Sequence, residues 1–260
     1  MVGIYFSGSG NSKYCIETFL GEYEAGAKAY SIEDEPVPEQ IRRQTELVFA
    51  YPVQYSNIPK ILNDYIEDHK ELWKGKKVFV IATMGLFSGD GAGILARLLS
   101  RYGAETVGGL HVKMPDSIAD EKALKRPLDV NRKLVAAATG KIRQAARDYQ
   151  QGKPPQEGIG VLCHLAGLFG QRLYFYNKTK RYTDQLRIDP QSCIGCQTCV
   201  TLCPMNNISM ENGIAVSSDR CTMCYRCVNR CPKQAITLLG RQVVEQCQIE
   251  KYCKRENENG

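Results

Sequence analysis

Four closely spaced cysteines followed by a proline decide the fold of the C-terminal part of this chain. The run reads Cys193-Ile194-Gly195-Cys196-Gln197-Thr198-Cys199-Val200-Thr201-Leu202-Cys203-Pro204. The same spacing returns 28 residues later, as Cys221-Thr222-Met223-Cys224-Tyr225-Arg226-Cys227-Val228-Asn229-Arg230-Cys231-Pro232. Each run follows the pattern C-x2-C-x2-C-x3-C-P. Residues 188–240 therefore predict a small α+β domain of two similar halves, related by two-fold pseudo-symmetry.

The spacing of these cysteines is typical of iron–sulfur ligation. Three thiolates at intervals of three residues can reach three irons of one cubane, and a fourth completes the ligand set. A zinc ribbon instead needs pairs of C-x2-C with a long gap between them. The pattern predicts two 4Fe–4S clusters, whose ligands are Cys193, Cys196, Cys199, Cys203, Cys221, Cys224, Cys227 and Cys231. Cys247 and Cys253 fall outside the pattern and are not counted as ligands.

These runs closely resemble the bacterial-type ferredoxins that carry two 4Fe–4S clusters. Ile194-Gly195 and Pro204-Met205-Asn206-Asn207-Ile208 also fit that family's pattern. The resemblance implies low-potential, one-electron transfer. In such ferredoxins the fourth cysteine of each run ligates the other cluster. Cys203 would then complete the second ligand set, and Cys231 the first.

Residues 1–150 alternate β-rich runs with helical periodicity, which is typical of a parallel sheet covered by helices on both faces. The pattern predicts an α/β, doubly wound, five-stranded sheet. The expected strands are Val2–Ser7, Ala29–Ile32, Leu47–Tyr51, Val78–Thr83 and Val107–Val112. Helical spacing of apolar residues predicts helices near 12–24, 58–66, 94–99 and 130–149.

Three polar, glycine-containing loops follow strands of this predicted sheet. The first is Ser7-Gly8-Ser9-Gly10-Asn11-Ser12, where backbone amides and a helix N-terminus can form an anion pocket. The others are 51–57 and 83–91. Open α/β sheets bind ligands at the carboxyl ends of their strands, so we expect the three loops to form one site.

With these loops, residues 1–150 resemble the flavodoxin family, which implies bound FMN. By that resemblance the phosphate would be held by Ser7, Ser9, Gly10, Asn11 and Ser12. One side of the isoalloxazine would contact Pro52, Val53, Gln54, Tyr55 and Asn57, with Tyr55 as the stacking candidate. The other side would contact Thr83, Met84, Gly85, Ser88, Gly89 and Asp90. The whole chain resembles the flavodoxin–ferredoxin fusion proteins of anaerobes.

Composition distinguishes the remaining regions of the chain. Residues 151–187 contain a Pro/Gly-rich start and a basic, apolar stretch, which predicts a connector. The alternatives are a docking surface for an acidic redox partner and an interfacial membrane helix. Residues 241–260 are predicted to be a C-terminal tail. The domain boundaries are therefore 1–150, 151–187, 188–240 and 241–260.

Net charge, glycine spacing and the lack of targeting signals argue against nucleic-acid binding, dinucleotide binding and export. Two clusters at about −2 each and a dianionic phosphate would offset the formal charge of +6, so nucleic acid is not an expected partner. The glycines do not match the spacing of a dinucleotide fingerprint. The chain begins without a basic and apolar leader, and it has no apolar run of about 20 residues. A cytoplasmic protein without membrane association is expected.

A flavin that exchanges two electrons and clusters that exchange one predict an electron carrier. Its partners would be other redox proteins. The alternative is an FMN-dependent reductase of a small organic substrate, fed through the clusters, with Tyr55, Asp90 and Asp116 as candidate proton donors. A third possibility is a redox sensor.

Overall fold

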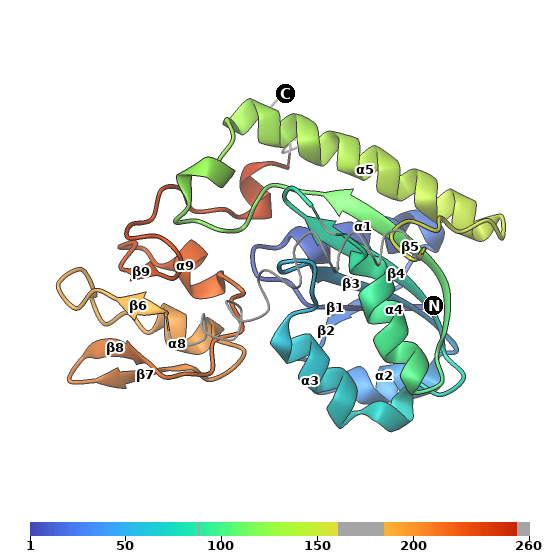
Figure 1. Ribbon diagram of the computed structural model, residues 1–260, viewed down its shortest axis with the longest axis horizontal. Coiled ribbons are helices and arrows are strands. Elements are labelled where there is room, and N and C mark those ends of the chain that lie inside the picture. The colour runs from blue at the N-terminus through green and yellow to red at the C-terminus, as the bar shows by residue number, and fades with distance from the viewer. Residues whose placement is uncertain (88, 161–184, 254–260) are drawn as a thin grey trace.

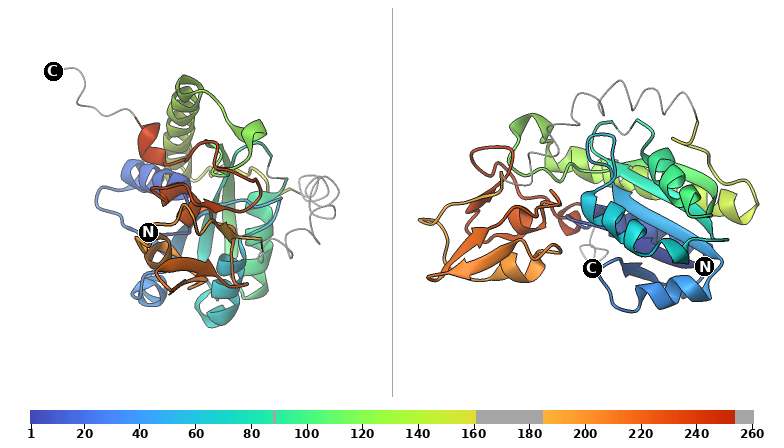
Figure 2. Two further views of the ribbon diagram at one scale, coloured as in Figure 1. Left: turned by 90° about the vertical axis from the view of Figure 1, so that its left-hand side faces the viewer. Right: turned by 60° about the horizontal axis from the view of Figure 1, so that its bottom comes forward.

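The computed structural model describes residues 1–87, 89–160 and 185–253. Figure 1 shows an α/β domain with a smaller domain beside one end of its sheet, and Figure 2 shows the same arrangement from two further sides. Within the described ranges, none of the helices combines the length and the apolar character that a membrane span requires.

Five parallel strands form the sheet of the N-terminal domain. They are β1 (Val2–Tyr5), β2 (Ala29–Ser31), β3 (Glu46–Pro52), β4 (Lys77–Met84) and β5 (Glu105–Lys113). Their order is β2-β1-β3-β4-β5, and every pairing is parallel. This is the flavodoxin-like order, with its switch point between β1 and β3. The predicted fold class is confirmed, with strand ends shifted by one or two residues.

Helices cover both faces because successive side chains of a buried strand point in opposite directions. In β3, Val48 joins one apolar cluster and its neighbour Phe49 joins the other. The Val48 face is covered by α1 (Asn11–Tyr23) and α5 (Leu128–Gln150). The Phe49 face is covered by α2 (Val37–Arg43), α3 (Lys60–Asp68) and α4 (Gly91–Arg101). Helix α2 was not predicted, because it is short and two prolines flank its start.

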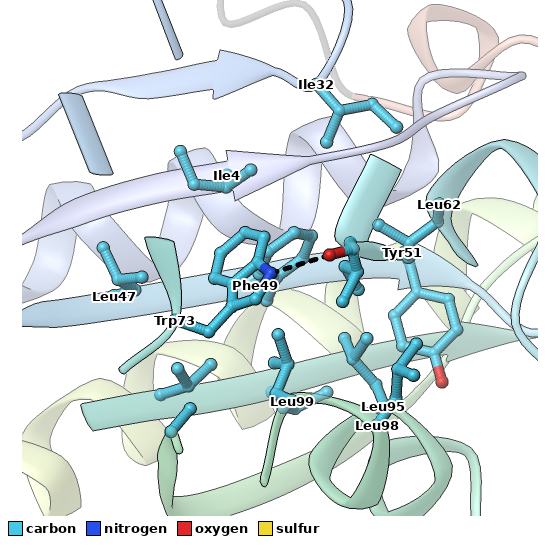
Figure 3. Close-up of a cluster of buried hydrophobic side chains, with 14 of the residues drawn as sticks. Ile4, Ile32, Leu47, Phe49, Tyr51, Leu62, Trp73, Leu95, Leu98 and Leu99 are labelled. Atoms are coloured by element: carbon cyan, nitrogen blue, oxygen red, sulfur yellow. Dashed lines mark hydrogen bonds between the residues drawn. The ribbon is translucent and has the colours of Figure 1, made fainter. Parts of the chain in front are cut away.

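Figure 3 shows the core on the Phe49 face, which lies between the sheet and helices α3 and α4. Phe49 and Trp73 are fully buried, with ring centroids 6.1 Å apart. The indole Nε1 of Trp73 donates to the carbonyl of Ile66 at 3.0 Å, so its one polar group is satisfied. This core makes the sheet a rigid support for the loops at its carboxyl edge.

The C-terminal domain shows the internal repeat directly. Helices α8 (Thr198–Leu202) and α9 (Arg226–Arg230) are offset by the same 28 residues as the cysteine runs. Two small antiparallel pairs complete the domain: β6 (Arg187–Ile188) with β9 (Ile236–Thr237), and β7 (Ile208–Glu211) with β8 (Ile214–Ser217). The predicted pseudo-symmetric α+β domain is confirmed.

Residues 241–253 differ from the predicted tail, because they return to the N-terminal domain. Ile249 and Tyr252 are buried in the cluster beneath α1 and α5. The Ile249 amide donates to the Ser9 carbonyl at 3.0 Å. We call residues 241–253 the return segment. Its apolar positions are too few for a periodic signal in the sequence, so only the packing identifies it. The last residues of the predicted tail, 254–260, are outside the described residues.

The start of the predicted connector lies alongside β5. The amide of Gly109 donates to the Pro155 carbonyl at 2.8 Å, and the Glu157 amide donates to the Gly109 carbonyl at 2.9 Å. These bonds place residues 155–157 at the free edge of the sheet. Most of the basic, apolar stretch considered as a docking surface falls in 161–184, outside the described residues.

Candidate cofactor sites

An open cavity lies where the loops after β1, β3 and β4 meet. Predicted flavin contacts that line it are Ser7, Ser9, Asn11, Ser12, Pro52, Val53, Gln54, Tyr55, Thr83, Met84 and Gly85. The three loops come from positions up to about 80 residues apart in sequence, and the shared sheet edge brings them together. A concave site of the N-terminal domain therefore lies at the place that the topology favours.

Four predicted contacts do not line this cavity. Gly10 is the N-cap of α1 at φ 93°, and a side chain there would collide with Ile249. Asn57 turns back, and its Oδ1 accepts from the Ile58 amide at 2.9 Å. The buried carboxylate of Asp90 pairs with Arg97. Gly89 lines a different cavity. One further predicted contact, Ser88, is outside the described residues.

The loop from Ser7 to Ser12 has the properties of an anion site. Helix α1 starts without a side-chain cap and without an acidic residue in its first turn. Its first amides are therefore open to an external acceptor, and the helix dipole favours a negative charge there. The hydroxyl of Ser7 is buried and has no hydrogen-bond partner among the described residues. A phosphate oxygen would satisfy that hydroxyl, so the residues present fit a phosphate.

The loop after β3 places Tyr55 on the wall of the cavity. Tyr55 and Ser56 both adopt positive φ, 50° and 58°, in a tight turn. The stacking role of Tyr55 stays a prediction. Leu86 and Phe87 also line the cavity and are exposed by 59% and 46%. Such exposed apolar side chains beside a polar loop suit the face of a flavin ring, and Phe87 is a second stacking candidate that the sequence reasoning missed.

The loop after β5 contributes further lining residues, of which only Asp116 was named from the sequence, as a candidate proton donor. They are Pro115, Asp116, Ser117, Ile118 and Leu124. The Asp116 carboxylate lies against Gly85, so a side chain at Gly85 would collide with it. Burial raises the pKa of Asp116 above its ordinary value, while the Ile118 amide, Lys125 and Arg126 act in the opposite direction. A carboxyl with a raised pKa can hold a proton beside a ligand.

Two smaller cavities lie in the C-terminal domain, and each is lined by four cysteines. Cys203, Cys221, Cys224 and Cys227 surround the first cavity. Cys193, Cys196, Cys199 and Cys231 surround the second. The fourth cysteine of each run thus lies with the other run, which is the crossed arrangement implied by the resemblance to ferredoxins. We call these the inner and the outer cluster cavity, respectively.

The chemistry of both cavities fits cubane ligation. All described cysteines are free thiols. No group of three His, Cys, Asp or Glu residues in the described part converges tightly enough for a single metal ion. A cubane differs from a single ion in that each thiolate binds a separate iron, so the ligands surround a cavity.

Backbone amides already point at the sulfurs. The amides of Asn207 and Met223 lie 3.3 Å from the Sγ atoms of Cys203 and Cys221, respectively. The amide of Ala235 lies 3.4 Å from the Sγ of Cys231. Hydrogen bonds to cluster sulfurs tune the reduction potential.

The open cavity at the loops after β1, β3 and β4 is called the flavin-type cavity below. The loop Thr222–Arg226 of the C-terminal domain contacts it, and Met223, Cys224 and Tyr225 line its wall. The side-chain amide of Gln54 donates to the carbonyl oxygens of Thr222 and Met223, at 3.1 Å and 3.2 Å. The guanidinium of Arg226 donates to the Ser7 carbonyl at 2.9 Å. Sequence reasoning missed these contacts, because nothing local indicates which loops of two domains will meet.

Asp120 ties the cluster domain to the loop after β5. Its carboxylate is buried and accepts from the Tyr225 hydroxyl at 2.8 Å. It also accepts from the amides of Leu238 and Leu239 at 2.6 Å and 3.0 Å. Asp120→Ala would leave two buried donors, the Tyr225 hydroxyl and the Leu238 amide, without this acceptor, and an unsatisfied buried group costs about 1–3 kcal/mol.

We therefore expect Asp120→Ala to destabilise the protein by at least about 2 kcal/mol, and Tyr225→Phe, which removes one hydrogen bond, by about 1 kcal/mol. The measurement is the urea concentration at which cluster absorbance is lost under anaerobic conditions. Equal midpoints for the two variants would show that Asp120 does not organise this interface.

Comparison with known proteins gives a direct match for the C-terminal part. A family model described as a 4Fe-4S dicluster domain matches residues 185–254, which include the return segment. No curated protein matches. Similar solved structures include the two-electron reduced flavodoxin of Megasphaera elsdenii, with 21% identity and a TM-score of 0.41, covering 56% of this chain and 98% of that chain. Flavodoxin 1 of Bacillus cereus has 20% identity and a TM-score of 0.41, covering 58% and 96%, respectively.

The strand order gives the N-terminal domain a flavodoxin-like fold, and residues 185–254 are similar to 4Fe-4S dicluster domains. Such clusters transfer single electrons. The general role supported for this chain is therefore electron transfer.

Proposed function

We propose that this chain, a flavodoxin-like domain joined to a dicluster domain, binds FMN and two 4Fe–4S clusters and relays electrons between them. A single observation carries the proposal. The flavin-type cavity is lined both by the predicted phosphate loop, including Ser7 and Ser9, and by Cys224, a predicted cluster ligand. A flavin in that cavity would lie beside a cluster within the same chain.

Each cofactor would have a distinct task in this relay. FMN accepts or gives electrons singly or in pairs, whereas a cluster exchanges one at a time. The protein's own residues hold the phosphate at α1, orient the ring between the loops after β3 and β4, and donate amide hydrogen bonds to the cluster sulfurs. Other redox proteins would supply and remove the electrons.

A second candidate is a reductase of a small organic molecule. It is favoured by one feature of the cavity: its rim carries the exposed side chains of Leu86 and Phe87, and its wall carries Asp116 with a raised pKa. A substrate on the ring could take a proton from Asp116 in that arrangement.

The two functions are separated by turnover under anaerobic conditions. The holoprotein should contain FMN and iron and should pass electrons from a low-potential donor to an acceptor redox protein without consuming an organic substrate. As a control, Asp116→Asn should leave this exchange within about twofold, because a carrier needs no proton donor at that position. Turnover of a small molecule much faster than exchange with any protein, and lost in Asp116→Asn, would favour the reductase.

A further inference from the structure

We infer that the two clusters have fixed and different places in the electron path. The inner cluster, held by Cys203, Cys221, Cys224 and Cys227, exchanges electrons directly with the flavin. The outer cluster, held by Cys193, Cys196, Cys199 and Cys231, is reached only through the inner one. This inference rests on the proposed function and adds an order to it.

The walls of the cavities carry this order. Cys224 and Tyr225 line both the flavin-type cavity and the inner cluster cavity. Among the described residues, none lines both the flavin-type cavity and the outer cluster cavity. One ligand residue, Cys224, therefore separates the flavin site from the inner cluster, whereas the outer cluster lies behind a different set of residues.

The contact between the two loops is close. A Cβ atom on Gly8, in the phosphate loop, would collide with the carbonyl oxygen of Cys224. Only a residue without a side chain allows the two backbones to approach this far. Gly8 thus brings the phosphate loop against the ligand loop of the inner cluster.

Hydrogen bonds hold this approach in place from both sides. Thr222 is 3% exposed, and its hydroxyl accepts from the Ile61 amide at 3.2 Å. On the other side, the guanidinium of Arg226 forms two bonds of 2.7 Å with the carboxylate of Glu33 in addition to its bond to Ser7. Both side chains of this ion pair are largely buried, at 18% and 26% exposure. The ligand loop of the inner cluster is therefore anchored to elements on both sides of the phosphate loop.

The outer cavity lies toward solvent. Cys196 is exposed, and its neighbour Ile194 has 58% of its surface exposed. An external carrier can approach the outer cluster here without displacing the flavin domain.

The electron balance of this path is simple. A two-electron-reduced flavin gives one electron to the inner cluster, which passes it to the outer cluster. The second electron then reduces the inner cluster. The flavin ends oxidised and its protons go to solvent, while each cluster ends reduced by one electron.

The first test measures reduction potentials rather than activity. FMN brings a phosphate dianion next to the inner cluster, and negative charge close to a cluster makes its reduction less favourable. EPR-monitored redox titrations compare FMN-free and FMN-loaded full-length protein. They use Cys203→Ala to retain the outer cluster and Cys231→Ala to retain the inner one. We expect FMN to lower the potential in Cys231→Ala and to leave it unchanged in Cys203→Ala.

Three outcomes overturn the inference: a shift only in Cys203→Ala, equal shifts in both variants, or no shift in either although FMN is bound. Absence of FMN binding in the wild-type protein would instead refute the proposed function, and flavin analysis separates the two failures.

A second test keeps all eight cysteines, in case a ligand variant does not fold. Gly8→Ala adds a methyl group at the contact with Cys224, whereas Gly21→Ala, in α1, is a matched control whose Cβ meets nothing within 4 Å. Bound FMN is reduced by light with EDTA as the electron donor, and cluster bleaching is followed. We expect loss of rapid bleaching in Gly8→Ala, whether the loops separate or FMN is displaced, and wild-type bleaching in Gly21→Ala. Wild-type bleaching in Gly8→Ala would overturn the inference.

Discussion

Cys203→Ala is expected to remove the cluster bound by the second cysteine run and to spare the one bound by its own run. Cys203 is the C-cap of α8, in the first cysteine run, yet it lines the inner cavity with Cys221, Cys224 and Cys227. Loss of one of four ligands should empty that cavity, and bound iron should fall from about eight to about four atoms per chain. Iron analysis and EPR of the reduced protein measure this change.

The reciprocal variant is the matched control. Cys231→Ala should empty the outer cavity and spare the inner one, because Cys231 lies with Cys193, Cys196 and Cys199. Cys253→Ala should retain all the iron, since Cys253 packs against the flavodoxin-like core. If Cys203→Ala selectively lost the cluster of the first run, the crossed ligand sets would be wrong.

Ser9→Asp is expected to abolish FMN binding. Ser9 is 6% exposed and lines the cavity within the phosphate loop, so a carboxylate there would face the phosphate in a site with little solvent. Two unit charges 4 Å apart repel by about 4 kcal/mol at an effective dielectric constant of 20. That energy corresponds to an affinity about 1000-fold lower. Titration of FMN into the flavin-free chain measures it.

Ser9→Ala separates charge from lost hydrogen bonding. It removes one hydroxyl, which is worth about 1 kcal/mol, or about a fivefold change in affinity. Unchanged iron content in Ser9→Asp would show that the chain still folds. An affinity in Ser9→Asp within tenfold of the wild type would refute the phosphate assignment.

Local patterns were sufficient to predict most of the fold. Successive side chains of a strand point to opposite faces of the sheet, so Val48 and Phe49 of β3 are expected on opposite faces, as the structure shows. The cysteine spacing predicted the repeat that the structure shows as α8 and α9. Helix α2 was missed, because seven residues with a proline near the start carry little periodic signal.

The sequence by itself determined the two domains, the alternation of strands and helices that forms a parallel sheet, the polar loops at one sheet edge and the two cysteine runs. All of these depend on residues that are close in the chain. The tertiary structure alone decided that Cys224 lies against Gly8, that Asp120 accepts from Tyr225, and that Ile249 packs beneath α1. Each of these contacts joins residues more than 100 positions apart, and each depends on how two folded surfaces fit together. Packing across a domain interface has no period along the chain, so no local pattern could have predicted which cluster lies beside the flavin-type cavity.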